Sequence, residues 1–404
     1  MRLFAEQRWL ALWAATLGYM LDAMDVLLYV FAVQTLRDQF HWSASTAGLV
    51  SSATLVTSAA GGIVAGMVAD RIGRTRTLVY AILLYSIGSA GSATSLGIGS
   101  LLAWRGVVGL GLGGAWSAGA VLVSESWPPQ HRAKAIGVVH SGWAIGYMLA
   151  AAATALILPR FGWRVLFLVG IVPAFLTIWI QRKVKEPEIW MNRTNVSPIS
   201  VLFRAPLARR TFFATALATS VLFAYWGLAT WLPGFLSAPK SQGGAGLNIL
   251  RTSAWIFTMQ FGAFLGYISF GWLADRYGRR PAFFWYVLAA AILTPIYGLT
   301  PRWAGEHSET WLLVLGPFIG FCGTGFFALF GAMLAELYPT SIRGTGQGFV
   351  YNVGRAISAL APFAVGAVAD RKGIGAALAL NSAFFLIGSV LIFTLPETKN
   401  TELA

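Results

Sequence analysis

Four charged side chains stand inside long apolar stretches of the sequence: Asp22, Asp25, Arg105 and Arg355. A spacing of three places the two acids on one face of a helix. A carboxylate inside a membrane is costly unless it is paired, hydrated or protonated, and burial favours its neutral form. We therefore expect at least one of the two acids to carry a coupling proton. The alternative is a structural salt bridge or a helix–helix hydrogen bond.

The two arginines offer a site for an anionic group. A buried guanidinium holds a carboxylate in a bidentate geometry that lysine does not reproduce. We expect Arg355 to bind a substrate carboxylate. For Arg105 two roles stay open, a second substrate contact and a partner for one of the acids. If both arginines paired permanently with Asp22 and Asp25, the charges would cancel and the cavity would bind neutral solutes.

Polar and aromatic neighbours of these charges are weaker candidates. His140 lies in another apolar stretch. Histidine titrates near physiological pH, so a role in proton or substrate binding stands beside the more common role of a hydrogen-bonded structural group. Further candidates for substrate contacts are Asn352, Tyr351, Tyr29 and Tyr225.

The composition indicates which elements position these groups. Hydrophobic residues make up 57% of the 404 residues and charged residues 11%. An average soluble domain has roughly 25% charged residues, so lipid must be the main solvent. A helix needs about 20 apolar residues to cross a bilayer. The sequence predicts an all-α protein with these spans: 9–34, 43–69, 77–98, 100–124, 134–158, 163–181, 211–236, 251–274, 281–299, 310–335, 345–368 and 375–395.

The basic residues between these spans predict the topology. With the N-terminus inside, inside loops hold 19 of the 29 lysines and arginines and outside loops hold 8, the other 2 being Arg105 and Arg355. This asymmetry favours two cytoplasmic termini, in a bacterial inner (plasma) membrane. It also accounts for the net charge of +14 without nucleic-acid binding, since no soluble basic domain remains.

Two motifs occur twice in the same order. The segment 66–74 recurs at 271–279, and the segment 125–132 recurs at 336–343. The shared residues are Gly66, Asp70, Arg71 and Arg74, then Asp275, Arg276 and Arg279, with Glu125 and Arg132 matching Glu336 and Arg343. Parallel repeats of this kind are a common plan for transporters. We predict a six-helix bundle over 1–181, a cytoplasmic linker over 182–210 and a second bundle over 211–404.

These motifs resemble those of the major facilitator superfamily. Its best marker is a short basic loop, Asp-Arg-x-Gly-Arg, after the second helix and again after the eighth. The stretch from Arg105 to Gly111 is similar to its fourth-helix motif. The resemblance implies a twelve-helix fold and a gating role for the repeated residues, whose ion pairs would form in the outward-open state and separate in the inward-open state. The alternative is that Arg71 and Arg74 only anchor the loop at the membrane surface.

The first predicted helix is similar to the Asp-x-x-Asp signature of organic-anion:proton symporters, which transport sialate, monocarboxylates or aromatic acids. The resemblance implies a monomeric symporter of a small organic anion, working by alternating access. The short central linker favours a monocarboxylate or an aromatic acid over sialate. Two rivals remain, a proton antiporter that exports drugs or metabolites and a membrane receptor or sensor that does not transport.

Other chemistry has no support in the sequence. No phosphate-binding Gly-Lys-Ser/Thr loop is present. The single Cys322 excludes an internal disulfide and a cysteine-based metal site. We therefore expect no enzymatic activity, no metal and no cofactor, with the proton as the coupling ion.

Overall fold

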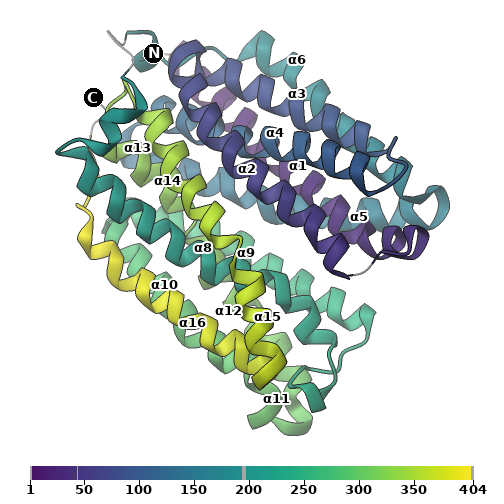
Figure 1. Ribbon diagram of the computed structural model, residues 1–404. Coiled ribbons are helices and arrows are strands. Elements are labelled where there is room, and N and C mark those ends of the chain that lie inside the picture. The colour runs from purple at the N-terminus through teal and green to yellow at the C-terminus, as the bar shows by residue number, and fades with distance from the viewer. Residues whose placement is uncertain (1, 43, 193–196, 402–404) are drawn as a thin grey trace.

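The structure is a computed structural model that describes residues 2–42, 44–192 and 197–401. All regular elements in these ranges are helices, in two bundles that lie side by side (Figure 1). The first bundle contains α1 (Arg2–Phe40), α2 (Ala44–Ile72), α3 (Arg74–Ser92), α4 (Ile98–Ser126), α5 (Arg132–Leu168) and α6 (Val172–Lys183). The second contains α8 (Leu207–Ser237), α9 (Ile249–Tyr277), α10 (Arg279–Gly298), α12 (Ser308–Gly325), α13 (Ala328–Leu337), α14 (Arg343–Ser358), α15 (Ala361–Lys372) and α16 (Ile374–Leu391).

Two short helices lie between the long ones. The predicted linker 182–210 contains α7 (Glu188–Met191), and its residues 193–196 lie outside the described ranges. The second short helix, α11 (Thr300–Trp303), joins α10 to α12.

Ten helical segments of the described chain are long and apolar enough to cross a membrane. The two other predicted spans, 77–98 and 345–368, are also helical, as α3 and as α14 with α15. They are less apolar because both bury polar residues against other helices. In α14, for example, Gln347 and Asn352 are fully buried. The prediction of twelve crossing helices is therefore confirmed for the fold, although two of them are too polar to stand out by hydropathy.

Some predicted spans are not single straight helices. Helix α5 is kinked at Gly162, whose φ of 75° suits glycine, so its last part, 163–168, belongs with α6 to the predicted span 163–181. The predicted span 310–335 is interrupted between α12 and α13, and the span 345–368 is interrupted between α14 and α15. The second interruption directly precedes Pro362, which cannot donate a helical hydrogen bond.

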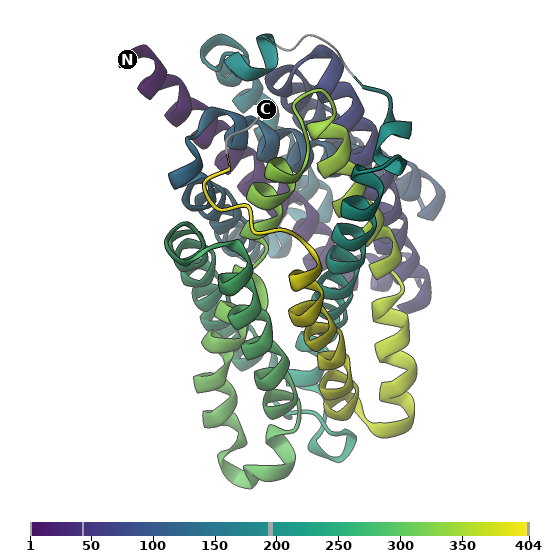
Figure 2. The same ribbon diagram turned by 90° about the vertical axis from the view of Figure 1, so that its left-hand side faces the viewer.

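The duplication seen in the sequence is present in the packing. Helix α2 packs on α4 as α9 packs on α12, and α1 packs on α5 as α8 packs on α14. The bundles meet along two equivalent seams, α2 against α14 and α5 against α9. Both ends of the chain lie at one end of the molecule, which we call the terminal face (Figures 1 and 2).

Glycines allow the close approach of the helices at both seams. A side-chain carbon placed on Gly66 would meet the backbone of Gly344 and lie 3.3 Å from the Cα atom of Thr345. A side-chain carbon on Gly271, the repeat counterpart of Gly66, would lie 2.8 Å from the Cα atom of Lys134. The repeated glycines therefore set the distance between the two bundles.

Candidate functional site

Asp22 is buried and makes no hydrogen bond or ion pair with the residues that the structure describes. Its side chain on α1 is 3% exposed, and its Oδ1 atom has no hydrogen-bond partner. No ion pair to Asp22 is formed by any described residue, and its principal electrostatic interactions are with Arg355 and Asp25. A carboxyl group without a direct partner in such surroundings costs far less to bury when neutral than when charged, and the coupling role of Asp22 stays a prediction.

Asp25 is held within the first bundle. Its Oδ1 atom accepts a hydrogen bond from Ser89 of α3, and its Oδ2 atom lies 3.8 Å from the Nη1 atom of Arg105 on α4. The Arg105 guanidinium also lies over the ring of Tyr29, 5.3 Å from its centroid. Of the two roles open for Arg105, this arrangement favours that of a partner for an acid. Tyr29 is buried against the Arg105 guanidinium, and its role as a substrate contact stays a prediction.

Arg355 reaches across the seam between the bundles. Its Nη1 atom donates a hydrogen bond of 2.7 Å to the hydroxyl of Ser58 on α2, and its guanidinium lies 5.1 Å from the ring centroid of Tyr351. Its Nε atom has no hydrogen-bond partner. The guanidinium thus has a neutral oxygen as partner and no carboxylate within ion-pair distance among the described residues. It can still receive a carboxylate.

Asn352 forms contacts between the two bundles beside Arg355. Its Nδ2 atom donates to the hydroxyl of Ser117 on α4 at 3.2 Å and to the carbonyl of Gly348 at 2.8 Å. A side-chain carbon placed on Gly62 would collide with the Asn352 amide. Asn352 is therefore a contact between the bundles in this conformation, with its Oδ1 atom buried and unpaired.

His140 is hydrogen-bonded at both ring nitrogens. Trp116 donates from its Nε1 atom to the Nε2 atom of His140 at 3.3 Å, and the Nδ1 atom lies 3.1 Å from the carbonyl of Ile136. Both contacts suit a neutral ring with its proton on Nδ1, because Trp116 can only donate. This geometry favours the structural role of His140, and its role in proton coupling stays a prediction.

Aromatic side chains from both bundles surround His140. The rings of Trp116 on α4 and Tyr351 on α14 stack across the seam with centroids 3.8 Å apart. Tyr19 on α1 and Tyr267 on α9 lie 5.4 and 5.9 Å from the His140 ring. Tyr351 is thus part of an aromatic contact between the bundles, directly beside Arg355.

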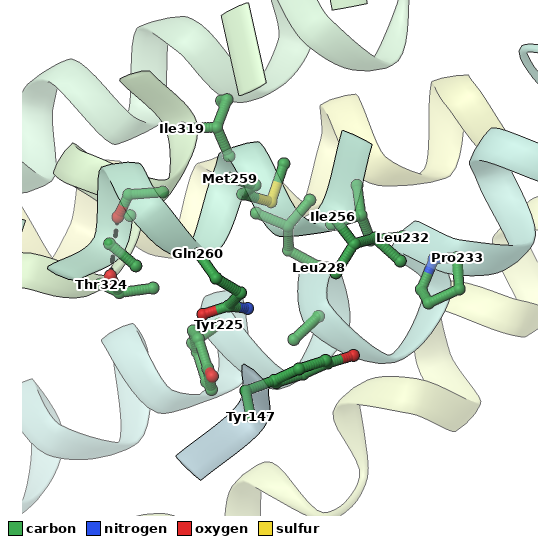
Figure 3. A pocket seen from close by; sticks show the side chains of 14 residues that line it. Tyr147, Tyr225, Leu228, Leu232, Pro233, Ile256, Met259, Gln260, Ile319 and Thr324 are labelled. Atoms are coloured by element: carbon green, nitrogen blue, oxygen red, sulfur yellow. Dashed lines mark hydrogen bonds between the residues drawn. The ribbon is translucent and has the colours of Figure 1, made fainter. Parts of the chain in front are cut away.

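A pocket lies between α5, α8, α9 and α12 (Figure 3). Tyr225, predicted as a substrate contact, lines it together with Tyr147, Gln260 and Thr324. Helix α8 begins at the terminal face, and the pocket residues occupy its later half. The pocket therefore lies toward the opposite end of the molecule.

Buried polar contacts join the bundles at the terminal face. The Asp70 carboxylate accepts hydrogen bonds from the backbone N–H groups of Gly344 and Thr345 at 3.0 and 2.7 Å, and from the Thr345 hydroxyl at 2.7 Å. These groups begin α14, where the helix dipole favours negative charge. Arg343 pairs with Glu125 at 2.7 Å. The first gate consists of Asp70, Arg74, Glu125, Arg343, Gly344 and Thr345.

The second gate repeats this arrangement with the bundles exchanged. The Asp275 carboxylate accepts from the N–H groups of Ala133 and Lys134 at 3.2 and 2.9 Å, at the start of α5. Arg132 pairs with Glu336 at 2.8 Å. The second gate consists of Asp275, Arg279, Glu336, Arg132, Ala133 and Lys134. With both gates formed, the structure is a conformation closed at the terminal face.

Within each gate one arginine links two acids of its own bundle. Arg74 lies 2.8 Å from Asp70 and 2.9 Å from Glu125, and Arg279 makes the equivalent pairs. The other repeated arginines do not take part in these pairs. Arg71 is exposed, and Arg276 is exposed with its guanidinium 5.0 Å from the Trp272 ring. A gating role stays a prediction for all the repeated residues, including those of the two gates, which take their name from their position between the bundles.

Some partners were not predicted from the sequence. Ser58 and Ser89 contact the buried charges, but serines are too common in these helices to stand out. Glu186 accepts from the first backbone N–H groups of α3, and Glu397 does the same at α10. These glutamates are 211 residues apart, the same offset as Glu125 and Glu336, so the repeat carried a signal that could have found them.

Comparisons with known proteins agree with this architecture. The chain matches the model of the Major Facilitator Superfamily over residues 15–243 and 241–404. A protein of Cupriavidus pinatubonensis named for 4-methylmuconolactone transport is 34% identical over 96% of this chain and 90% of its own length. The cis,cis-muconate transport protein of Acinetobacter baylyi is 29% identical over 95% of this chain and 94% of its own length.

A solved structure shows the same fold. The proton:xylose symporter XylE bound to 6-bromo-6-deoxy-D-glucose superposes with a TM-score of 0.82, covering 99% of this chain and 98% of that one at 17% identity. The family match, the relatives and the duplicated fold identify a membrane transporter rather than an enzyme. The chain belongs to the major facilitator superfamily.

Proposed function

We propose that this transporter is a proton-coupled symporter of a small organic anion. The observation that carries the proposal is that two charged groups, one in each bundle, lack a direct contact with a group of opposite charge. Asp22 in the first bundle makes no hydrogen bond or ion pair with a described residue, and the direct contacts of Arg355, its electrostatic neighbour in the second bundle, are a hydroxyl and an aromatic ring. A proton on the acid and a carboxylate on the guanidinium would complete both groups.

The proposed cycle begins at the face opposite the termini. A proton neutralises Asp22 or Asp25, and the carboxylate of the substrate binds Arg355. With the acid protonated and the arginine paired with the substrate carboxylate, fewer unpaired charges are buried when the loaded transporter passes through its occluded state. The gates separate, the bundles rock, and proton and anion leave at the terminal face. We assign that face to the cytoplasm of a bacterial inner membrane, with the monomer as the working unit.

The relatives support an organic anion as the substrate. One relative is named for transport of muconate, which carries carboxylates. Another is named for transport of 4-methylmuconolactone, which is a small organic acid. Such substrates need a fixed cation, and Arg355 is the half-buried guanidinium at the seam that lacks an acid partner among the described residues. We therefore propose a small carboxylate, either a monocarboxylate or an aromatic or sugar acid.

Uptake into proteoliposomes tests the proposal. An inward proton gradient should drive accumulation of a labelled carboxylate such as benzoate. Asp22→Asn or Asp25→Asn should abolish accumulation while leaving exchange at equal pH, and accumulation that survives in both variants would contradict the coupling assignment. Arg355→Lys should weaken the apparent affinity at least tenfold, because the bidentate contact is lost. Accumulation driven only by the reverse gradient would indicate an antiporter. Binding without any exchange would indicate a receptor.

A further inference from the structure

A pocket of about 350 Å³ lies between the start of α3 and the end of α6, beside the first gate. We call it the α3–α6 pocket. Arg76 and Tyr80 of α3 line it, together with Gln181 and Val184 at the end of α6 and Glu186 in the loop that follows. Ligand pockets have volumes of about 300 to 1,000 Å³. The α3–α6 pocket therefore has room for a small polar group.

The surroundings of this pocket are positively charged. The guanidinium of Arg76 is exposed and makes no hydrogen bond or ion pair with a residue that the structure describes. Arg182, Lys183 and Lys185 lie next to pocket residues in the chain and are also exposed. The acid that lines the pocket, Glu186, is occupied, because its carboxylate accepts from the first three backbone N–H groups of α3 at 2.6 to 3.1 Å. The cations are thus available to an anion from outside the chain.

The equivalent place in the second bundle lacks these cations. At the repeat offsets of 205 and 211, the counterparts of Arg76, Arg182, Lys183 and Lys185 are Pro281, Phe393, Thr394 and Pro396. There the Arg280 guanidinium lies 5.2 Å from the ring centroid of Phe393 and donates to the carbonyl of that residue. The preference of basic residues for one side of a membrane applies to both bundles. It does not account for a cluster that only the first bundle carries.

An exposed apolar face continues from the cation on each helix. Helix α3 packs on α6, and spacings of three and four residues place the apolar side chains on the faces of Arg76 and Arg182. These exposed side chains are Tyr80, Leu84 and Ile87 on α3 and Phe175 and Ile178 on α6. Tyrosine is enriched at the headgroup level of membranes, which suits Tyr80 one turn from Arg76. Each helix therefore presents a cation at the headgroup level and apolar side chains toward the lipid tails.

We propose that the α3–α6 pocket binds the headgroup of an anionic phospholipid. Its phosphate contacts Arg76 and Arg182, because a guanidinium holds a phosphate through two parallel hydrogen bonds. Its acyl chains lie along the exposed apolar faces of α3 and α6. Basic pockets between membrane helices suit such headgroups. A free phosphate would use the same guanidinium chemistry, but it would leave the apolar faces unused. The inference goes beyond the proposed function, since it involves neither Arg355 nor the coupling proton.

Lipid titrations of the purified full-length protein test this inference. Native mass spectrometry gives dissociation constants for phosphatidylglycerol and phosphatidylcholine that carry identical acyl chains. We expect the wild-type protein to bind phosphatidylglycerol at least tenfold more tightly. A basic residue near the membrane surface contributes about fivefold to the affinity for an anionic lipid. Arg76→Gln and Arg182→Gln should therefore each lower the ratio about fivefold, and the double variant should bring it close to one.

Two controls accompany these variants. Arg280→Gln is the matched control, because it removes a cation from the start of α10 at the equivalent place in the second bundle. It should keep the wild-type ratio. The side chains of Arg76 and Arg182 are exposed, so both variants should unfold at the wild-type temperature in lipid-free detergent. That measurement separates a loss of lipid binding from a loss of folded protein.

Several outcomes would overturn the inference. Equal affinity of the wild-type protein for the two lipids would exclude a site for anionic headgroups. A preference that survives in the double variant, or that falls equally in Arg280→Gln, would show attraction by the whole face rather than by the α3–α6 pocket. Inorganic phosphate, titrated as a competitor, should not displace phosphatidylglycerol at concentrations comparable with that of the lipid. Displacement there would identify a site for free phosphate and exclude the lipid.

Discussion

Removal of the charge of Asp70 should open the terminal face. In the closed conformation its carboxylate accepts three hydrogen bonds from the other bundle, at Gly344 and Thr345. The Asp70→Asn amide has a single oxygen acceptor, so at least one of these bonds is lost and an N–H group faces a donor. A hydrogen bond to a charged group contributes about 1.5 to 3 kcal/mol. The ratio of open to closed molecules should therefore rise about tenfold to a hundredfold.

Distances between spin labels across the terminal face would measure this ratio. Arg76 and Arg276 are exposed on opposite bundles and lie outside the ion pairs of the gates, so both can be replaced by labelled cysteines. The native Cys322 is first changed to serine. Electron–electron double resonance then gives the populations of the short and long distances. We expect the Asp70→Asn variant to move population from the short distance to the long one.

Two further variants make the result decisive. Asp275→Asn should act in the same direction but less strongly, because Asp275 accepts two bonds from the other bundle instead of three. Glu309→Gln is the control, since its ion pair with Arg251 is exposed and lies within one bundle. If Asp70→Asn changes the ratio no more than Glu309→Gln does, the gates do not hold the terminal face closed and the reasoning is wrong.

Three other predictions concern the seams and the buried charges. Gly66→Leu should prevent closure, because any side chain there meets the backbone of Gly344; the same label pair should report the long distance alone. Ser58→Ala removes the neutral partner of Arg355 and should tighten carboxylate binding up to about tenfold in titrations, since the ligand no longer competes with a hydroxyl. Asp22→Asn should stabilise the folded protein or leave it unchanged in thermal unfolding, because a neutral amide replaces an unpaired acid; clear destabilisation would mean that Asp22 has a partner.

The sequence was sufficient to predict the fold and the equivalent residues of the two repeats, but it was insufficient to predict which buried charges pair. The duplicated segments predicted two six-helix bundles and marked Asp70 and Asp275 as equivalent residues, because a repeat constrains order and spacing. The assignment of Arg105 to Asp25 stayed open, because it depends on how α1, α3 and α4 rotate against each other. The hydrogen bond between Trp116 and His140 was likewise not predicted, because the two residues lie on different helices. The helix break at Gly162 falls in the predicted gap between 158 and 163, whereas the interruptions inside the spans 310–335 and 345–368 were not predicted, because hydropathy reports the length of a span and not its direction.

The reciprocal layout of the gates has a consequence for the origin of the chain. In an isologous dimer each subunit presents the same surface patch, so every contact occurs twice about a twofold axis. The gates fit that description, because each bundle contributes one aspartate that accepts hydrogen bonds from the first N–H groups of a helix in the other bundle. A pair of identical six-helix subunits would have carried both gates from a single gene. Within one polypeptide the two halves can differ, and here Asp22 and Asp25 occur in one half and Arg355 in the other.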